Sequence, residues 1–233
     1  AEHADKLIHD AAVDADKLVF GALPSTVALA AASVTLAALW GMTLAVGSVA
    51  RPGRVASACD GLIAAGSTVP LLAYAPALTW VLAVRIRWVP LPADPNAGLL
   101  GLLWAAALLA IPLGAAVARV ARAALRAVSK ATFLTVARAK GNSEGSVWLR
   151  HALPPCSGPI VTVVSAQLGA LLGGAILLER LLERPGLGTV LAEALAARDL
   201  PVLQASVLGS CLLFVVVQEL GRALHERIDP RME

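Results

Sequence analysis

The chain has 233 residues, of which 58% are hydrophobic, 15% are charged and 4% are aromatic. A single soluble domain of this size needs more polar surface than this composition supplies. The composition therefore excludes one soluble globular domain and predicts a membrane protein.

Five long apolar runs support this prediction. Each lacks Lys, Arg, Asp, Glu and His, and they cover Ala22–Ala50, Gly61–Val84, Ala97–Ala118, Ala152–Leu178 and Leu200–Val217. A helix crosses roughly 30 Å of hydrocarbon with about 20 apolar residues. The sequence therefore predicts an all-α, polytopic membrane protein with five transmembrane helices in this chain.

The residues before the first run are polar. Leu7, Ile8 and Val13 recur among acidic residues and lysines in Ala1–Gly21, a pattern that predicts an amphipathic helix. We expect residues 1–21 to form an extracytoplasmic segment and residues 22–233 to form the transmembrane domain.

A short polar and basic island separates the third run from the fourth. It reads ARAKGNSEGSVWLRHALP over Ala137–Pro154, and its place between two runs puts it at a membrane surface. Gly141 interrupts a helix, while Pro154 marks the entry to the next span. Such a segment suits contact with a moving partner. The alternative is an ordinary amphipathic surface helix.

The spacing within this island resembles the cytoplasmic coupling motif of bacterial ABC importer permeases. The motif has a small residue, a glycine four positions later, and then an apolar residue or His before Leu-Pro; here it comprises Ala137, Gly141, His151, Leu153 and Pro154. The resemblance implies that these five residues dock an ATPase within a coupling segment at about residues 130–154. One departure is Thr135, where that family often has an acidic residue.

The resemblance extends from about Leu23 to Arg231. Residues 171–208, LLGGAILLERLLERPGLGTVLAEALAARDLPVLQASVL, and the closing IDPR are similar to the first permease type of dipeptide, oligopeptide and nickel ABC importers. It implies a second homologous permease, two cytoplasmic ATPase subunits that use ATP and Mg, and an extracytoplasmic solute-binding protein. It also implies a multi-pass protein of the bacterial inner membrane, with a sixth helix before this chain.

The basic residues orient the chain. If the island is cytoplasmic, 12 of the 19 Lys and Arg residues lie inside, as the positive-inside rule expects. The C-terminus is then cytoplasmic and Ala1 is outside. A translocated amino terminus predicts an upstream helix or a removed signal segment.

No ionisable residue lies in the middle of any run, so the chain lacks the groups that couple transport to an ion gradient. It also has no GxxxxGK[ST] phosphate loop. We therefore expect no catalytic residues, no bound cofactor and no metal in this chain, with ATP hydrolysis in partner subunits. The three cysteines predict no disulfide.

Polar residues inside the runs are candidates for a translocation path: Ser67, Thr68, Gln167 and Gln204. The alternative is that Ser and Thr bond to local carbonyls while Gln bridges helices. A basic stripe, Arg119, Arg122, Arg126 and Lys130, follows the third run along one helix face. It predicts contact with an acidic protein or with anionic headgroups.

The sequence thus predicts a permease subunit of an ATP-driven importer, for dipeptides or oligopeptides, that forms a path with a second permease. A nickel chelate, haem or another small solute is an alternative substrate. A secondary transporter, a channel subunit and a structural scaffold are alternatives from other classes. The lipid bilayer is an expected partner, and nucleic acid is not.

Overall fold

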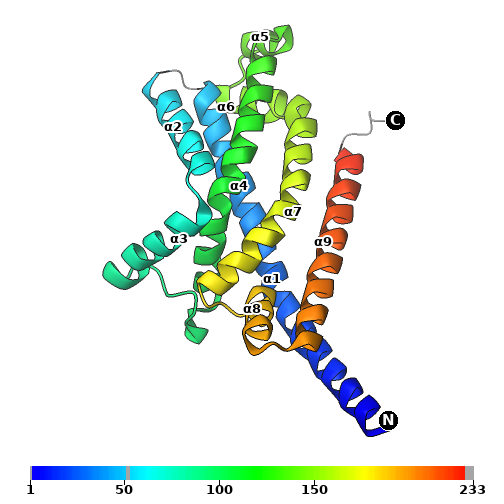
Figure 1. The fold of residues 1–233 in the computed structure, drawn as a ribbon. Coiled ribbons are helices and arrows are strands. Elements are labelled where there is room, and N and C mark those ends of the chain that lie inside the picture. Colours follow the sequence, from blue (N-terminus) through cyan, green and yellow to red (C-terminus); the bar gives the residue numbers. More distant parts are fainter. Residues whose placement is uncertain (1, 51–52, 229–233) are drawn as a thin grey trace. The chain divides into compact units, whose positions relative to one another are not determined.

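The structure is a computed structural model that describes residues 2–50 and 53–228. These residues form helices joined by short connections, and they include no strand (Figure 1). The α-helices are α1 (Glu2–Ala50), α2 (Arg54–Thr68), α3 (Leu71–Thr79), α4 (Gly98–Ser129), α5 (Thr132–Ala139), α6 (Glu144–Ser146), α7 (Ser157–Leu181), α8 (Leu187–Ala197) and α9 (Leu200–Ile228). The π-helices η1 (Trp80–Arg85) and η3 (Val147–Ala152) and the 3₁₀ turns η2 (Pro95–Ala97) and η4 (Pro154–Cys156) complete the set.

Among the described residues, three helices are long and apolar enough to cross a membrane: Ala15–Ala50, Gly98–Ser129 and Leu200–Ala223. Two pairs of shorter helices, Arg54–Thr68 with Leu71–Arg85 and Pro154–Gln167 with Leu171–Leu181, raise the number to five if each pair counts as one span. The all-α, polytopic class predicted from the sequence is confirmed. The helix of the second run is broken between α2 and α3, whereas the fourth run bends by 47° within α7.

Pro70 causes the break in the second run. The backbone of Val69 and Pro70 is extended, with ψ of 123° and 137°. Proline disfavours helical backbone at the residue before it, and its ring obstructs the helical hydrogen bond, so α2 ends and α3 begins there. Pro76 and Pro112 lie inside α3 and α4, which continue through them.

The amino-terminal segment joins the first span. Helix α1 continues through Gly21 without a break, so residue 21 is not a helix boundary. The predicted amphipathic pattern falls mostly on residues 2–14, whose side chains lie outside the description. Residues 51 and 52, between α1 and α2, lie outside the described residues, and Gly53 before α2 has a φ of +97°.

The described residues divide into two compact units. One comprises those within 1–33, 70–109 and 168–217, and the other those within 34–69, 110–167 and 218–233. The second unit, called the coupling unit below, has an apolar cluster made by α1, α4, α5, η3 and η4: Ala45, Ala121, Leu125, Leu134, Ala137, Val147, Trp148, Ala152 and Cys156. This cluster supports the polar island.

Candidate functional site

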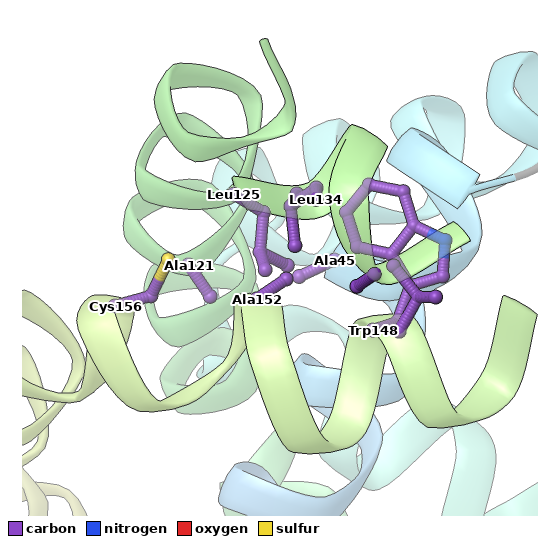
Figure 2. Close-up of a cluster of buried hydrophobic side chains, with 9 residues drawn as sticks. Ala45, Ala121, Leu125, Leu134, Trp148, Ala152 and Cys156 are labelled. Carbon is purple, nitrogen blue, oxygen red and sulfur yellow. The ribbon is translucent and has the colours of Figure 1, made fainter. Parts of the chain in front are cut away.

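Helix α5 leads into the polar island, and its inner face packs against the rest of the coupling unit. Leu134 and Ala137 are buried in the apolar cluster. Residues three apart lie on the same side of a helix, so these two side chains fix one face of α5 inward. Figure 2 shows Leu125 of α4 and Leu134 side by side at the centre of the cluster, between Trp148 and Cys156.

Gly141 turns the chain at the end of α5. Its φ is +79°, in the left-handed region that residues with a Cβ seldom adopt. The Gly141 N–H donates to the carbonyl of Arg138 at 2.9 Å, and the Asn142 amide donates to that of Ala137 at 2.9 Å. These bonds satisfy carbonyls that the last helical turn leaves open. The helix interruption predicted from Gly141 is confirmed.

An ion pair spans the turn. Nε of Arg138 donates to Oε1 of Glu144 at 2.8 Å, and Nη2 lies 3.4 Å from Oε2. This fork-shaped contact lowers the pKa of the Glu144 carboxyl, chiefly through the hydrogen bond from Arg138, and it raises the pKa of the Arg138 guanidinium. Both side chains are exposed, so the pair orders the turn more than it stabilises the fold.

The chain returns to the apolar cluster after the turn. The Ser143 hydroxyl accepts a hydrogen bond from the Ser146 N–H at 3.4 Å at the start of α6. Val147, Trp148 and Ala152 of η3 are then buried in the cluster. The island is therefore attached at both ends to one packed core.

The apolar residues of the coupling segment face two ways. Of Phe133, Val136, Ala137 and Trp148, the structure buries only Ala137 and Trp148. Phe133 and Val136 are 47% and 48% exposed. They lie three residues apart on α5 and form the surface called the outer face of α5 below.

The five predicted docking residues lie in the same unit with different exposure. Ala137 is buried, His151 and Leu153 are half-buried, and Gly141 and Pro154 are exposed. Pro154 opens the η4 turn, and α7 begins at Ser157, so the predicted entry to the next span is confirmed. Their role in docking stays a prediction.

Two of the four basic stripe residues, Arg122 and Arg126, are paired within the coupling unit. The Asp60 carboxylate of α2 accepts a hydrogen bond from Arg122, and its other oxygen lies 3.6 Å from Arg126. Arg119 and Lys130 are exposed. The sequence pattern did not identify Asp60 as a partner, because Asp60 lies 62 positions from Arg122.

The four path candidates show local bonding. The hydroxyls of Ser67 and Thr68 donate to carbonyls of their own helix, those of Ile63 at 2.7 Å and Ala64 at 3.0 Å. That is the alternative reading stated for them above. Gln167 is half-buried and Gln204 is exposed. These residues belong to both units, and their place on a path stays a prediction.

A buried carboxylate was missed by the sequence analysis. Glu179 of α7 is fully buried, and its Oε2 accepts the Gly188 N–H at 2.8 Å, at the start of α8. Beside it, the Thr26 hydroxyl of α1 accepts the Leu187 N–H at 2.9 Å. The unpaired N–H groups of a helix start attract such acceptors, so α8 is bonded to α1 and α7.

The surroundings of Glu179 explain the motif that follows it. A Cβ on Gly188 would overlap the backbone carbonyl of Ile176, so only glycine fits there. Arg184 supplies the counter-charge: burial lowers the pKa of its guanidinium, and the charge of Glu179 acts in the opposite direction. In the sequence, the sign of this contact is an acidic residue at the end of an apolar run with a glycine nine residues later.

The geometry defines an all-helical membrane protein with a surface segment fixed between two spans. A family profile described as "Binding-protein-dependent transport system inner membrane component" matches residues 23–233. The chain belongs to this family. The membrane class expected from composition is thereby confirmed.

Among curated proteins, the chain is similar to permease proteins of peptide transport systems. The chain is 32% identical over 195 residues to the dipeptide transport system permease protein DppB of Alkalihalophilus pseudofirmus, covering 72% of this chain and 58% of the relative. It is 33% identical over 208 residues to the glutathione transport system permease protein GsiC of Pectobacterium atrosepticum, covering 87% and 66%. The chain thus spans less than two thirds of the length of these two relatives. Against GsiC of Escherichia coli strain K12 it is 32% identical over 222 residues, covering 93% and 70%.

Solved structures share the fold. A chain of the MetNI methionine ABC transporter in an inward-facing conformation aligns with a TM-score of 0.69 and 18% identity, over 91% of this chain and 96% of that one. A chain of an amino acid ABC transporter crystallised with histidines gives 0.69 and 16%, over 92% and 96%. At such identity the likeness shows the fold alone.

Proposed function

We propose that the chain is the permease subunit of an ATP-driven importer and that the outer face of α5 docks an ATPase subunit. One observation carries the docking: Phe133 and Val136 stay exposed on a helix whose inner face is buried in the coupling unit. Two neighbouring apolar side chains on a fixed helix suit a protein partner. Arg138 and Lys140, both exposed, supply charge at its end.

The attachment of the island supports transmission of movement. Helix α5 packs on the core through Leu134, and η3 packs on it through Val147 and Trp148. A packed interior transmits displacement because it has little free volume. In the proposed mechanism, ATP-driven closure of two ATPase subunits moves α5 and, through this core, α4 and α7. The energy comes from ATP and Mg bound by those subunits, and this chain supplies no catalytic group.

The remaining partners follow from the same proposal. A second homologous permease completes the path, and an extracytoplasmic solute-binding protein delivers the solute. The island and the C-terminus are cytoplasmic in this arrangement. Relatives named for dipeptide and glutathione transport favour short peptides as the substrate class. A nickel chelate, haem or another small solute is the alternative.

Copurification with the ATPase subunits tests docking. Phe133→Glu and Val136→Glu place a charge in the proposed contact, and we expect each to weaken ATPase binding at least about tenfold because it removes an apolar side chain that docking would bury. Thr135→Glu is the matched control, since it adds the same charge to α5 at an exposed polar position. Full retention of the ATPase by both apolar-site variants would refute the docking face.

The energy source separates this function from a secondary transporter or channel. Proteoliposomes that contain the complete complex should take up solute only with ATP on the ATPase side, and uptake should survive an uncoupler. Gradient-driven uptake without ATP would refute the importer and favour the other class.

A further inference from the structure

The end of the α3–η1 helix carries an exposed cluster of aromatic and cationic side chains. Trp80 is 54% exposed and Trp88 is 78% exposed. The Arg85 guanidinium lies over the Trp80 ring, 5.1 Å from its centroid. Arg85 and Arg87 are the only Lys, Arg, Asp, Glu or His residues in the sequence from Gly61 to Ala93. The cluster is therefore cationic, and the nearest acid in the sequence is Asp94, six residues beyond Trp88.

Helices α3 and η1 are held along one side. Ala75, Thr79 and Ala83 are buried and recur every four residues, which defines an inner face. The Nε1–H of Trp104 in α4 donates a hydrogen bond to the Thr79 hydroxyl at 3.2 Å, so this face lies against α4. Large apolar residues are nevertheless exposed along both helices: Leu72, Leu78, Trp80, Val81 and Val84. Trp80, Val81 and Val84 lie away from the inner face by helical spacing, so the surface that they form needs an apolar environment.

The backbone fixes the cluster at the helix end. Ile86 and Trp88 donate their N–H groups to the carbonyls of Val81 and Leu82, each at 2.9 Å. Arg87 between them has a φ of +60°, in the left-handed region. These bonds end the helix and place Trp88 immediately beyond its apolar stretch. Tryptophan is enriched at that position in membrane helices because its ring is apolar and its N–H is polar.

We propose that Trp80, Arg85, Arg87 and Trp88 form an interfacial anchor that binds the phosphate of anionic phospholipid headgroups. Two guanidinium groups present forked donors that match phosphate oxygens. The Trp80 ring holds Arg85 beside the apolar stretch, so the charge sits where hydrocarbon gives way to headgroups. The anchor marks the level at which this run leaves the hydrocarbon.

Charge and apolar character together favour lipid as the occupant over a protein. Exposed apolar residues continue along α3 and η1, and cations are confined to the end of η1, as at a bilayer boundary. Anionic headgroups attract each nearby Lys or Arg. A protein subunit that covers the same face is the competing outcome, and the experiments distinguish the two.

The first experiment measures depth. Single-tryptophan variants that retain only Trp88 or only Trp104 are reconstituted, within the complete complex, in vesicles with bromines at defined acyl positions. We expect Trp88 to be quenched most by bromines nearest the headgroup. Absence of quenching at every depth, or quenching that occurs in the isolated subunit and disappears in the complex, would show a protein-covered face and overturn the proposal.

The second experiment measures headgroup preference in phosphatidylcholine vesicles with and without phosphatidylglycerol. Arg85→Gln and Arg87→Gln should each lower the retention of phosphatidylglycerol about fivefold. Arg198→Gln is the matched control, because Arg198 is also exposed at a helix end with a φ of +57° and has no tryptophan within ten positions. An equal loss of phosphatidylglycerol retention in Arg198→Gln would overturn the proposal. So would a shift in Trp80 emission that free inorganic phosphate in detergent produces as strongly as phosphatidylglycerol does.

Discussion

Arg138 and Glu144 form a two-point ion pair across the turn at Gly141, with contacts of 2.8 and 3.4 Å. The pair joins the end of α5 to the start of α6. Because both partners are exposed, its effect is local and depends on pH and salt.

The first prediction concerns pH. The pKa of the Glu144 carboxyl is lower in the fold than in the unfolded chain, so the pair contributes stability above the unfolded value of about 4.3. That contribution is lost as the pH falls through the lower folded value. Arg138→Gln should therefore raise the pKa of Glu144 measured by NMR, whereas Arg150→Gln should leave it in place. The same pKa of Glu144 in the unchanged protein and in both variants would contradict the pairing of Glu144 with Arg138.

The second prediction concerns Gly141. A residue with a Cβ costs about 1–2 kcal/mol in the left-handed region, so Gly141→Ala should destabilise the turn by about that amount. Gly145→Ala is the control, since Gly145 lies in α6 with open space around it. Hydrogen exchange over residues 138–147 measures the difference. Equal exchange in the two variants would show that the backbone conformation at Gly141 carries no penalty.

The third prediction concerns the start of α8. Gly188→Ala should destabilise the protein by about 1–3 kcal/mol because the added methyl group meets a helix carbonyl that cannot rotate away. Glu179→Ala should cost about as much, since it leaves a buried N–H unpaired. Gly173→Ala, on α7 with open space around it, is the control. Thermal unfolding in detergent gives the ranking, and a neutral Gly188→Ala would argue against this packing.

The fourth prediction concerns orientation. In a protein whose native cysteines Cys59, Cys156 and Cys211 are replaced by alanine, a single cysteine at Lys140 should react only from the cytoplasmic side. One at Ala93 should react only from the outside. Both positions are exposed, so access depends on the membrane alone. Labelling of both from the outside would reverse the proposed orientation.

Local chemistry determined much of what the sequence predicted correctly. Long uncharged runs become apolar helices because a buried backbone needs internal hydrogen bonds, whatever the neighbours are. Gly141 ends α5 because only glycine readily takes the conformation required there. The family likeness also rests on spacing along the chain, which the sequence contains directly.

Tertiary structure decided which side of each helix is covered. Phe133, Val136 and Ala137 are all apolar, and only packing against α4 and η3 buries the last and leaves the first two exposed. Asp60 meets Arg122 across 62 positions, and Glu179 meets the start of α8. Helical periodicity gives the relative directions of side chains but not the partner they meet, because burial depends on segments far apart in the sequence.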